Sequence, residues 1–251
     1  MKVSIITVVL NGVATIERNL DSIADQRTCH DEIEHILIDG GSTDGTLELL
    51  HQRRNQIEVL ISEPDSGLYD AMNKGIRLAT GDIVGTLNAD DYYANPQVLR
   101  DISQLFQSQK VDAVFGDLEY FNPKRQTFTT RLYRSAHFTP EKLSSGMMPA
   151  HPTLFLRKSV YDRFGLFKPE YKIAGDFDFI ARIFKNGDLN YTYVPRILTR
   201  MQSGGVSTRG LKSTILLNKE ILRSCQENQI PTNFLKLLLR YPKKLLEYVD
   251  K

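Results

Sequence analysis

The first 91 residues alternate between short apolar runs and segments whose apolar residues recur at helical spacing. A β-branched run at 3–10 is followed by Ile16, Leu20 and Ile23 at helical spacing, and a second apolar run follows at 34–39. Further apolar runs at 57–62 and 82–87 enclose a segment, 68–79, that is typical of a helix. About four strand–helix units of this kind favour an α/β fold with a mostly parallel, Rossmann-like sheet flanked by helices.

Each apolar run ends in polar or flexible residues. The four endings are Asn11-Gly12, the segment from Asp39 to Gly45, the segment from Glu63 to Gly67, and Asn88-Ala89-Asp90-Asp91. In open parallel sheets, ligands bind beyond the carboxyl ends of the strands. The pattern therefore predicts that these endings line one edge of one sheet and form a binding site there.

The rest of the chain changes character. Residues 111–134 read as a strand and a hairpin around Asn122, followed by shorter mixed elements, and 211–251 reads as a helical tail with a break near Ile230-Pro231. We expect a domain over 1–210, built from halves at 1–91 and 92–210, and a tail at 211–251. This organisation fits a chain of 251 residues that is 41% hydrophobic.

Charge and cysteine usage exclude several classes of protein. With 32 Lys and Arg against 30 Asp and Glu, the formal charge is +2, which does not favour nucleic-acid binding. Cys29 and Cys225 form neither a disulfide framework nor a zinc motif, which fits a reducing cytoplasm. The apolar run at 3–10 is too short to span a membrane.

The segment Asn88-Ala89-Asp90-Asp91 places two adjacent carboxylates after an apolar strand. Like charges repel, and burying them is costly unless a positive group compensates. Mg²⁺ and Mn²⁺ prefer carboxylate and phosphate oxygens. The segment therefore indicates a divalent-metal site at Asp90 and Asp91, with a surface turn as the alternative.

Two other strand endings are candidates for holding a nucleotide. Asp39 could accept a hydrogen bond from a base or a ribose, and Asp44 could help to seat the ligand, although a capped glycine-rich turn explains both residues as well. The chain lacks GxGxxG and GxxxxGK[ST] at these positions. Asp65 and Asp70 flank Gly67, where acids also favour a helix amino terminus.

The ordered motifs resemble family 2 glycosyltransferases, which have the glycosyltransferase A fold. They are SIITVVLN at 4–11, IDGGSTDGT at 38–46, EPDSGLYDAMNKG at 63–75, GDIVGTLNADD at 81–91 and AGDFDF at 174–179. The resemblance implies a nucleotide-sugar donor bound by 1–91 and an acceptor bound by 92–210.

By this resemblance, the family holds the nucleotide at Thr7, Asn11, Asp39 and Asp65. A divalent metal, Mn²⁺ or Mg²⁺, bridges the donor diphosphate at the family's DxD motif. Asn88 stands at the first position of that motif here, which leaves Asp90, with Asp91 beside it, as the metal ligand.

The resemblance also makes Asp176 the catalytic base. Inverting transfer needs one carboxylate to remove the proton of the acceptor hydroxyl. Gly175 stands where the family more commonly has Glu, and Asp178 is the next candidate base. An N-cap role for Asp176 is the alternative. His151 is a candidate for contact with the acceptor or the diphosphate, or a structural histidine.

The chain has no Trp, and so lacks the Gln-x-x-Arg-Trp motif of the family's processive synthases. We therefore expect a single-addition enzyme acting on a glycan or lipid-linked saccharide, as in bacterial capsule or O-antigen synthesis. A catalytically inactive subunit that binds sugar nucleotides or glycans and partners another transferase is the alternative. Asp90 and Asp176, which such a subunit need not keep, favour the enzyme.

The tail combines apolar and basic residues. Leu235, Leu238, Leu239, Leu245, Leu246 and Val249 alternate with Lys236, Arg240, Lys243 and Lys244. Such a helix can lie on an anionic membrane surface, here the inner face of the cell membrane, or pack on the domain with its basic face in water. Both readings stay open at the level of the sequence.

Overall fold

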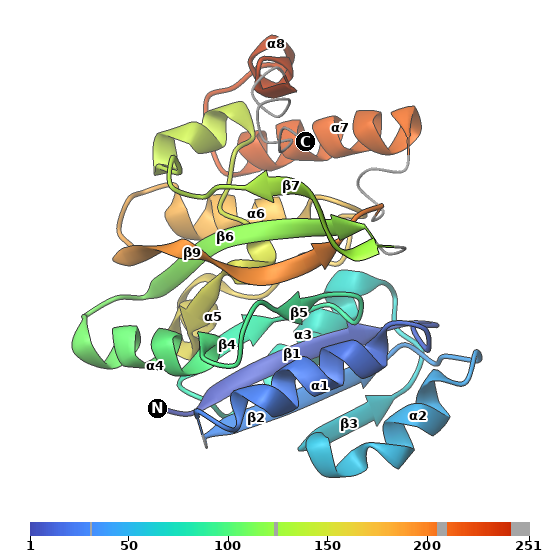
Figure 1. The fold of residues 1–251 in the computed structure, drawn as a ribbon. Helices are drawn as coiled ribbons and strands as arrows, with labels where there is room; N and C mark the ends of the chain where they lie inside the picture. The colour runs from blue at the N-terminus through green and yellow to red at the C-terminus, as the bar shows by residue number, and fades with distance from the viewer. Residues whose placement is uncertain (31, 123–124, 205–209, 242–251) are drawn as a thin grey trace.

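Helices cover both faces of one continuous sheet (Figure 1). The structure, a computed structural model, describes residues 1–30, 32–122, 125–204 and 210–241. Its strands follow the order β3-β2-β1-β4-β8-β6-β9-β5, and β7 pairs with β6. The sheet is parallel from β3 to β4 and mixed beyond β4.

The first half has the expected alternation of strands and helices. Its elements are β1 (Val3–Val9), α1 (Ile16–Gln26), β2 (Ile33–Asp39), α2 (Thr46–Gln52), the 3-10 helix η1 (Arg54–Gln56), β3 (Val59–Ser62), α3 (Leu68–Leu78) and β4 (Ile83–Thr86). Every residue of β1 and of β2 is buried, as expected for strands covered on both faces.

Alternate residues of β1 point to opposite faces of the sheet and join different parts of the core. Ile5 packs in the cluster that contains Ile23 of α1, whereas Ile6 packs in the cluster that contains Met72 and Ile76 of α3. The helical spacing of apolar residues in the sequence thus corresponds to the faces that α1 and α3 turn toward the sheet.

The second half extends the sheet with mixed strands. Its elements are β5 (Tyr92–Tyr93), α4 (Val98–Ser108), β6 (Ala113–Asn122), β7 (Arg125–Tyr133), the 3-10 helices η2 (Pro140–Ser145) and η3 (His151–Thr153), β8 (Phe155–Arg157), α5 (Lys158–Phe164), α6 (Gly175–Phe184) and β9 (Tyr191–Gln202). Strand β8 runs antiparallel to both β4 and β6, and so joins the two halves. The expected hairpin is β6 with β7.

The tail is helical where the structure describes it. Helix α7 (Leu211–Glu227) packs on α6, and α8 (Phe234–Leu238) packs on η2 and α7, in the upper part of Figure 1. The expected break near Ile230-Pro231 lies between them. Lys243, Lys244, Leu245, Leu246 and Val249 lie outside the described residues. Within the described ranges, no helix is long and apolar enough to cross a membrane.

Candidate active site at the carboxyl edge of the sheet

Asp39 ends β2 and holds together the loops around it. Its carboxylate accepts hydrogen bonds from the Ser62 hydroxyl (2.6 Å) at the end of β3, and from the Ser42 backbone N–H (3.1 Å) and hydroxyl. The side chain is fully buried. Asp39 therefore fixes the β2–α2 loop, and in this structure its acceptor capacity is used within the protein.

The loops after β1 and β2 are bonded to each other at the surface. The Asn11 backbone N–H donates to the Ser42 hydroxyl (2.8 Å), and the Thr43 N–H donates to the Asn11 side-chain oxygen (2.9 Å). Asp44 accepts from the Val13 N–H (3.1 Å). Asn11 has a left-handed backbone (φ 52°), a conformation that Asn tolerates better than most residues. Asn11 and Asp44 are exposed, as a ligand-binding role requires.

The third loop places Asp65 beside the end of β2. Its carboxylate accepts from the Gly67 N–H (2.8 Å), and a Cβ on Gly40 would lie 2.6 Å from Asp65 Oδ2. Asp70, in the first turn of α3, accepts from the Ser66 N–H (3.0 Å), which lowers the pKa of its carboxyl. Asp70 thus has the helix-terminal role expected as its alternative.

Thr7 lies apart from these exposed loops. It is fully buried within β1, where its hydroxyl is 3.0 Å from Nε2 of His35. Burial lowers the pKa of His35 to about 4, so the ring is neutral. The structure therefore places Thr7 in the core beneath the edge, where it supports the strands and does not face a ligand directly.

Helix α1 holds the loop that follows β4. The Asn19 side-chain amide donates to the carbonyl oxygens of Asn88 (2.9 Å) and Asp91 (3.1 Å), and the Arg18 guanidinium donates to that of Asp90 (3.0 Å). Side chains of one helix thus bind three backbone carbonyls of a four-residue loop. Neither Arg18 nor Asn19 stands out in the sequence, because such contacts leave no periodic pattern.

The two adjacent acids of this loop have different environments. Asp91 is fully buried, and its carboxylate accepts from the Gln202 N–H (3.3 Å) of β9 and the Asn88 side-chain amide (3.2 Å). Asp90 is partly exposed. Burial raises the pKa of both carboxyls, and the Asp90 charge raises that of Asp91 further. Asp90 is therefore the accessible carboxylate, whereas Asp91 points into the protein.

The loop nevertheless offers two acceptors suited to a cation. Asn88 Oδ1 is buried and has no hydrogen-bond partner among the described residues, and Asp90 presents its carboxylate nearby in the chain. In the part of the chain that the structure describes, no three His, Cys, Asp or Glu residues cluster as a metal site. This donor set fits Mn²⁺ or Mg²⁺, which commonly binds one or two carboxylates and takes its other ligands from phosphates and water.

His151 lies in η3, at the end of β4. Its Nε2 is 3.5 Å from the Thr86 hydroxyl, and its ring packs edge-on against Phe167 at 5.7 Å between centroids. Burial lowers the pKa of His151 to about 4. The ring is therefore neutral at pH 7, so it can donate or accept one hydrogen bond but brings no positive charge to a diphosphate.

Asp176 is the second residue of α6, whose N-cap is Ala174, so the alternative that Asp176 is the N-cap is wrong. Its carboxylate accepts from the Phe177 N–H (2.7 Å) and from the Tyr69 hydroxyl of α3 (3.4 Å). Burial raises its pKa to about 6, in spite of these hydrogen bonds. Asp176 is partly exposed, mainly ionised at pH 7, and a better proton acceptor than an ordinary aspartate.

Tyr69 explains the glycine that precedes Asp176. A Cβ on Gly175 would lie 2.6 Å from the Tyr69 ring, a distance that real Cβ atoms essentially never show. The ring thus fills the space that the Glu expected from the family resemblance would need. Tyr69 belongs to the motif at 63–75, but only the fold brings it to α6.

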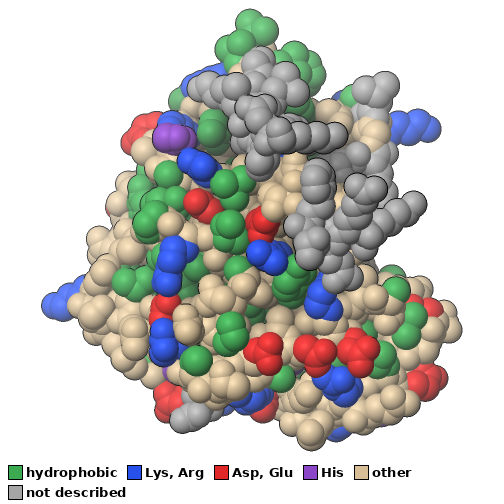
Figure 2. All heavy atoms as spheres, in the orientation of Figure 1, with side chains coloured by type: hydrophobic (Ala, Val, Ile, Leu, Met, Phe, Trp, Pro, Cys, Tyr) green, Lys and Arg blue, Asp and Glu red, His purple; other side chains and the backbone are tan. Residues whose placement is uncertain are grey.

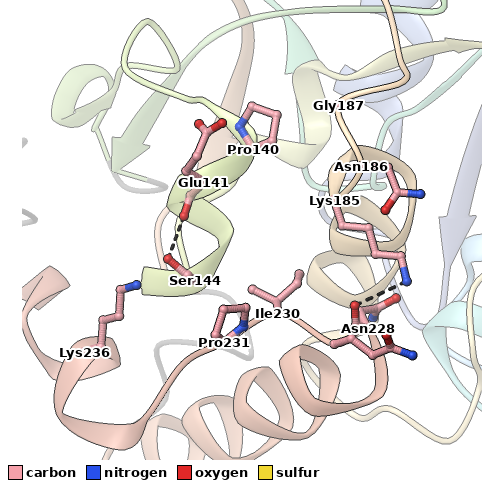
Figure 3. Close-up of a pocket in the computed structure, with 11 residues that line it drawn as sticks. Pro140, Glu141, Ser144, Lys185, Asn186, Gly187, Asn228, Ile230, Pro231 and Lys236 are labelled. Carbon is pink, nitrogen blue, oxygen red and sulfur yellow. Dashed lines mark hydrogen bonds between the residues drawn. The ribbon is translucent and has the colours of Figure 1, made fainter.

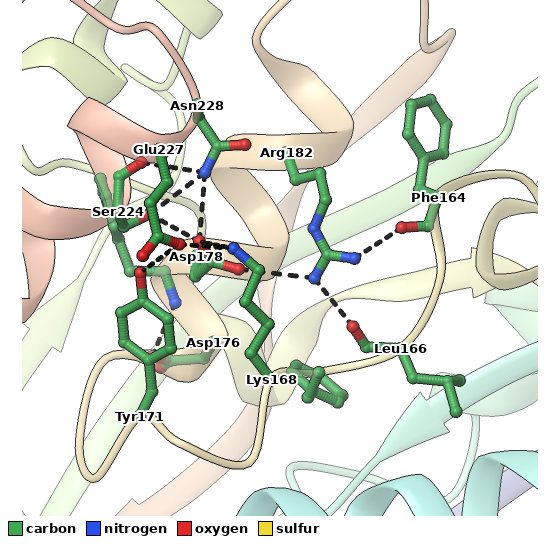
Figure 4. Close-up of polar contacts among 12 residues, drawn as sticks. Phe164, Leu166, Lys168, Tyr171, Asp176, Asp178, Arg182, Ser224, Glu227 and Asn228 are labelled. Atoms are coloured by element: carbon green, nitrogen blue, oxygen red, sulfur yellow. Dashed lines mark hydrogen bonds and ion pairs between the residues drawn. The ribbon is translucent and has the colours of Figure 1, made fainter.

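Asp178 is unsuited to act as a base. It is fully buried and is surrounded by Lys168 (3.3 Å), Arg182 (3.5 Å), Ser224 (3.1 Å) and Asn228 (3.1 Å), as Figure 4 shows. These contacts connect α6 to α7. Asp178 therefore has a structural role and does not reach an acceptor.

A cavity of about 500 Å³ lies elsewhere, between η2, the end of α6 and the α7–α8 connection (Figure 3). Lys185, one of its lining residues, follows the last residue of α6, whereas Asp176 lies in the first turn. A helix of ten residues spans about 15 Å. No predicted site residue is among the described residues that line this cavity, so the sheet edge remains the candidate site.

Comparisons with known proteins agree with this geometry. The sequence model of glycosyl transferase family 2 matches residues 4–164. A PGL/p-HBAD biosynthesis glycosyltransferase of Mycobacterium bovis (strain BCG) is 32% identical over 224 residues, which are 88% of this chain and 82% of the relative.

Solved structures share the fold. S. aureus TarS 1-349 in complex with UDP-GlcNAc superposes with a TM-score of 0.69 at 21% identity, over 97% of this chain and 73% of that chain. The Pyrobaculum calidifontis mannosyltransferase PcManGT, in complex with GDP-Man and Mn²⁺, has a TM-score of 0.67 at 20% identity, over 92% of this chain and 65% of that chain.

The fold and its edge define the class as nucleotide-sugar-dependent glycosyltransferases with the glycosyltransferase A fold. The chain belongs to glycosyl transferase family 2. The expected family and the expected α/β fold are confirmed.

Proposed function

We propose that this enzyme transfers one sugar, with inversion, from a nucleoside-diphosphate sugar to a hydroxyl group of a glycan or lipid-linked saccharide. The observation that supports this most is Asp176, a partly exposed carboxylate with a pKa of about 6 that α3 contacts from the donor half through Tyr69. A carboxylate in this state accepts a proton at neutral pH and releases it readily afterwards.

The chemistry assigned to Asp176 is general-base catalysis. As the acceptor oxygen attacks the anomeric carbon, the bond from that carbon to the diphosphate oxygen breaks on the opposite face. The proton of the acceptor hydroxyl passes to the Asp176 carboxylate. The products are the inverted glycoside, the nucleoside diphosphate and a protonated Asp176, which then returns its proton to water.

The donor nucleotide binds the loops at the carboxyl edge in this proposal. Asn11, Asp44 and Asp65 are accessible enough to contact it, whereas Thr7 and Asp39 act from inside by holding the strands and loops. His151 supplies a neutral ring near the end of β4 for the acceptor or the diphosphate.

We propose that Asp90 and Asn88 hold Mn²⁺ or Mg²⁺. A bound divalent cation neutralises charge on the leaving diphosphate. Asp91, with its carboxylate bonded to Gln202, orients the loop and is not the primary ligand. The complex of PcManGT with GDP-Man and Mn²⁺ lends support to a metal in this fold.

The acceptor belongs, in this proposal, to cell-surface polysaccharide synthesis of the capsule or O-antigen type, on the inner face of the cell membrane. Apolar side chains gather over α8 at the top of Figure 2. Phe234, Leu235, Leu238 and Leu239 are exposed there, beside Lys236. An apolar surface with an adjacent lysine suits anionic lipid, so the enzyme would reach lipid-linked acceptors as a peripheral membrane protein.

One observation favours a second candidate, an inactive subunit that binds sugar nucleotides or glycans. Gly175 replaces the acidic residue expected before Asp176, and Tyr69 fills its space. Such a subunit would bind the donor but transfer nothing.

The test measures transfer and donor affinity together. Wild-type protein and Asp176→Asn are incubated with UDP- and GDP-sugars, Mn²⁺ and soluble glycan acceptors. General-base catalysis contributes roughly 10² to 10⁴ in rate, so Asp176→Asn should lower kcat by that factor and leave donor Kd nearly unchanged. If the wild type binds the donor but transfers no sugar, the inactive subunit is supported. If Asp176→Asn transfers sugar at nearly the wild-type rate, Asp176 is not the base.

A further inference from the structure

Glu220 of α7 binds the backbone that leads into the catalytic helix. One carboxylate oxygen accepts from the Lys172 N–H (2.8 Å), and the other accepts from the N–H groups of Ile173 (2.9 Å) and Ala174 (2.8 Å). The Glu220 side chain is buried. A single buried carboxylate thus binds three consecutive backbone N–H groups.

These N–H groups lie at the amino terminus of α6, immediately before Gly175 and Asp176. The N-cap residue, Ala174, has no side chain that could accept a hydrogen bond. Glu220, from another helix, accepts from the backbone N–H groups of this N-cap residue and of the two residues before it, and its negative charge is favourable at a helix amino terminus. The Tyr69 hydroxyl of α3 donates to the Ile173 carbonyl oxygen (2.7 Å). The peptide before Asp176 is therefore held from both α7 and α3.

Residues near the carboxyl end of α7 also dock this helix on the rest of the protein. Ser224 and Asn228 bond to buried Asp178, and Glu227 binds Lys168 (2.6 Å) and Tyr171 (3.1 Å), as Figure 4 shows. These contacts lie one to two turns further along α7. Glu220 differs from these other residues of α7 because its partners are the backbone N–H groups that lead into α6 and so determine the position of Asp176.

We propose that Glu220 is a positioning residue for Asp176, which makes α7 part of the catalytic apparatus although it lies beyond the residues that the family model matches. The inference rests on the proposed function, in which Asp176 is the base. It assigns to Glu220 the task of holding the first turn of α6 so that the Asp176 carboxylate meets the acceptor hydroxyl.

The charge of Glu220 should affect the pH profile of kcat/KM, whereas a residue that only anchors the structure would leave this profile unchanged. Tyr69 from α3 and Glu220 from α7 face Asp176, while Asp178 on the same helix is paired with Lys168 and Arg182. Burial is the main cause of the raised pKa of Asp176, and the negative charge of Glu220 raises that pKa further. Neutralising Glu220 lowers the pKa of Asp176, so Asp176 stays deprotonated further into the acid range. The acidic limb of the pH profile of kcat/KM therefore moves to lower pH.

Three variants separate charge, reach and general anchoring. Glu220→Gln removes the charge and turns an amide donor toward an N–H group, so kcat should fall roughly 10- to 100-fold and the acidic limb should move to lower pH. Glu220→Asp keeps the charge but is one methylene shorter, so kcat should fall while the limb stays closer to that of the wild type. Glu227→Gln, on the same helix, should lower the melting temperature and leave kcat and the limb unchanged.

The measurements are kcat, donor and acceptor KM, and pH profiles on preparations with matched circular dichroism spectra. Folded Glu220→Gln with kcat within twofold of wild type and the same limb overturns the inference. If that variant does not fold, near wild-type kcat in Glu220→Asp overturns it instead. A kcat loss in Glu227→Gln equal to that in Glu220→Gln overturns it too. Absence of any transfer by the wild type is a different result: it refutes the proposed function, and the inference with it.

Discussion

Asp176 receives opposing influences from several parts of the fold. Burial and the Glu220 charge raise its pKa, whereas hydrogen bonds from the Phe177 N–H and the Tyr69 hydroxyl lower it, and the balance is a pKa of about 6. A base is most effective when its pKa lies near the working pH. The acidity of this residue is thus a property of three helices, α3, α6 and α7, and not of its own sequence motif.

Tyr69→Phe tests one of these influences. The ring stays against Gly175, but the hydroxyl bonds to Asp176 (3.4 Å) and Ile173 (2.7 Å) are lost. The hydrogen bond to Asp176 favours the ionised carboxylate, so its loss should raise the pKa of Asp176. The acidic limb of the pH profile of kcat/KM should then move to higher pH, by up to about one pH unit. This shift is opposite in sign to that expected for Glu220→Gln.

Tyr161→Phe is the matched control, since Tyr161 is buried and stacks on Phe179 at 5.1 Å between ring centroids. Its pH profile should match that of the wild type. A Tyr69→Phe limb that stays in place, or that moves to lower pH, would contradict the assignment of Tyr69.

Asp90 and Asp91 should respond differently to substitution, although they are adjacent. Asp90→Ala removes the accessible carboxylate, so it should abolish turnover and the Mn²⁺-dependent part of nucleotide binding. Burial raises the pKa of Asp91, which means that the fold disfavours its charged form, so Asp91→Asn should retain metal-dependent binding. Donor Kd with Mn²⁺ and with EDTA measures both effects. Full wild-type activity in EDTA would contradict the metal requirement. Loss of Mn²⁺ dependence in Asp91→Asn would show that Asp91 is a metal ligand.

Among the elements, those with a local periodic signal could be predicted and those formed by distant contacts could not. Continuous runs of apolar, β-branched residues predicted β1 and β2, and the helical spacing of apolar residues predicted α1 and α3. The short strands β5 and β8 have only two and three residues, too few to show a period. The boundary expected after residue 210 assigned α7 to a separate tail. The contacts between α7 and α6 could not be predicted, because hydrogen bonds such as that from the Ala174 N–H to Glu220 join residues 46 positions apart and leave no local pattern.

The same limit applies to the site. The acids at the strand ends were visible in the sequence, because strand endings in a parallel sheet share one edge. Which acids are accessible depends on tertiary packing. Asp39 and Asp91 are fully buried, whereas Asp65 and Asp90 are partly exposed, and both groups have the same local sequence character.

Helix α8 separates its inward from its outward residues within a single turn. Leu237 is fully buried against the domain, whereas Leu235 and Leu239 are 68% and 63% exposed. The packing of the tail on the domain is thus seen at Leu237, whereas membrane contact by the exposed leucines stays a prediction.

Substitution of the outward face tests membrane contact more cleanly than truncation after Gln229, which would also remove buried Leu237. Leu235→Ser with Leu239→Ser should reduce binding to vesicles that contain anionic lipid and leave transfer to a soluble acceptor unchanged. Leu78→Ser is the control, because Leu78 is an exposed leucine of α3, 40% accessible, on another element. Vesicle cosedimentation that is identical in all three proteins would remove the membrane role of α8.

At the scale of the whole molecule, the two halves form one unit. Strand β4 of the first half pairs with β8 of the second. The buried Asn73 side chain of α3 donates to the Phe167 carbonyl oxygen (2.8 Å) and accepts from the Phe167 N–H (3.0 Å). Because the sheet and these reciprocal bonds cross the junction near residue 91, neither half has a complete core of its own.

This continuity predicts a single calorimetric unfolding transition that a donor nucleotide shifts as a whole. A ligand at 100 times its Kd stabilises the native state by about 2.7 kcal/mol, which for a chain of this size raises Tm by several degrees. UDP and GDP, each with Mn²⁺ and with EDTA, should therefore move the entire transition for the preferred base, and by less in EDTA. The calorimetric and van't Hoff enthalpies should agree. Two separate transitions, with the nucleotide shifting only one, would mean that residues 1–91 and 92–210 fold independently, and that binding at the sheet edge does not depend on the contacts between α3 and the α5–α6 loop.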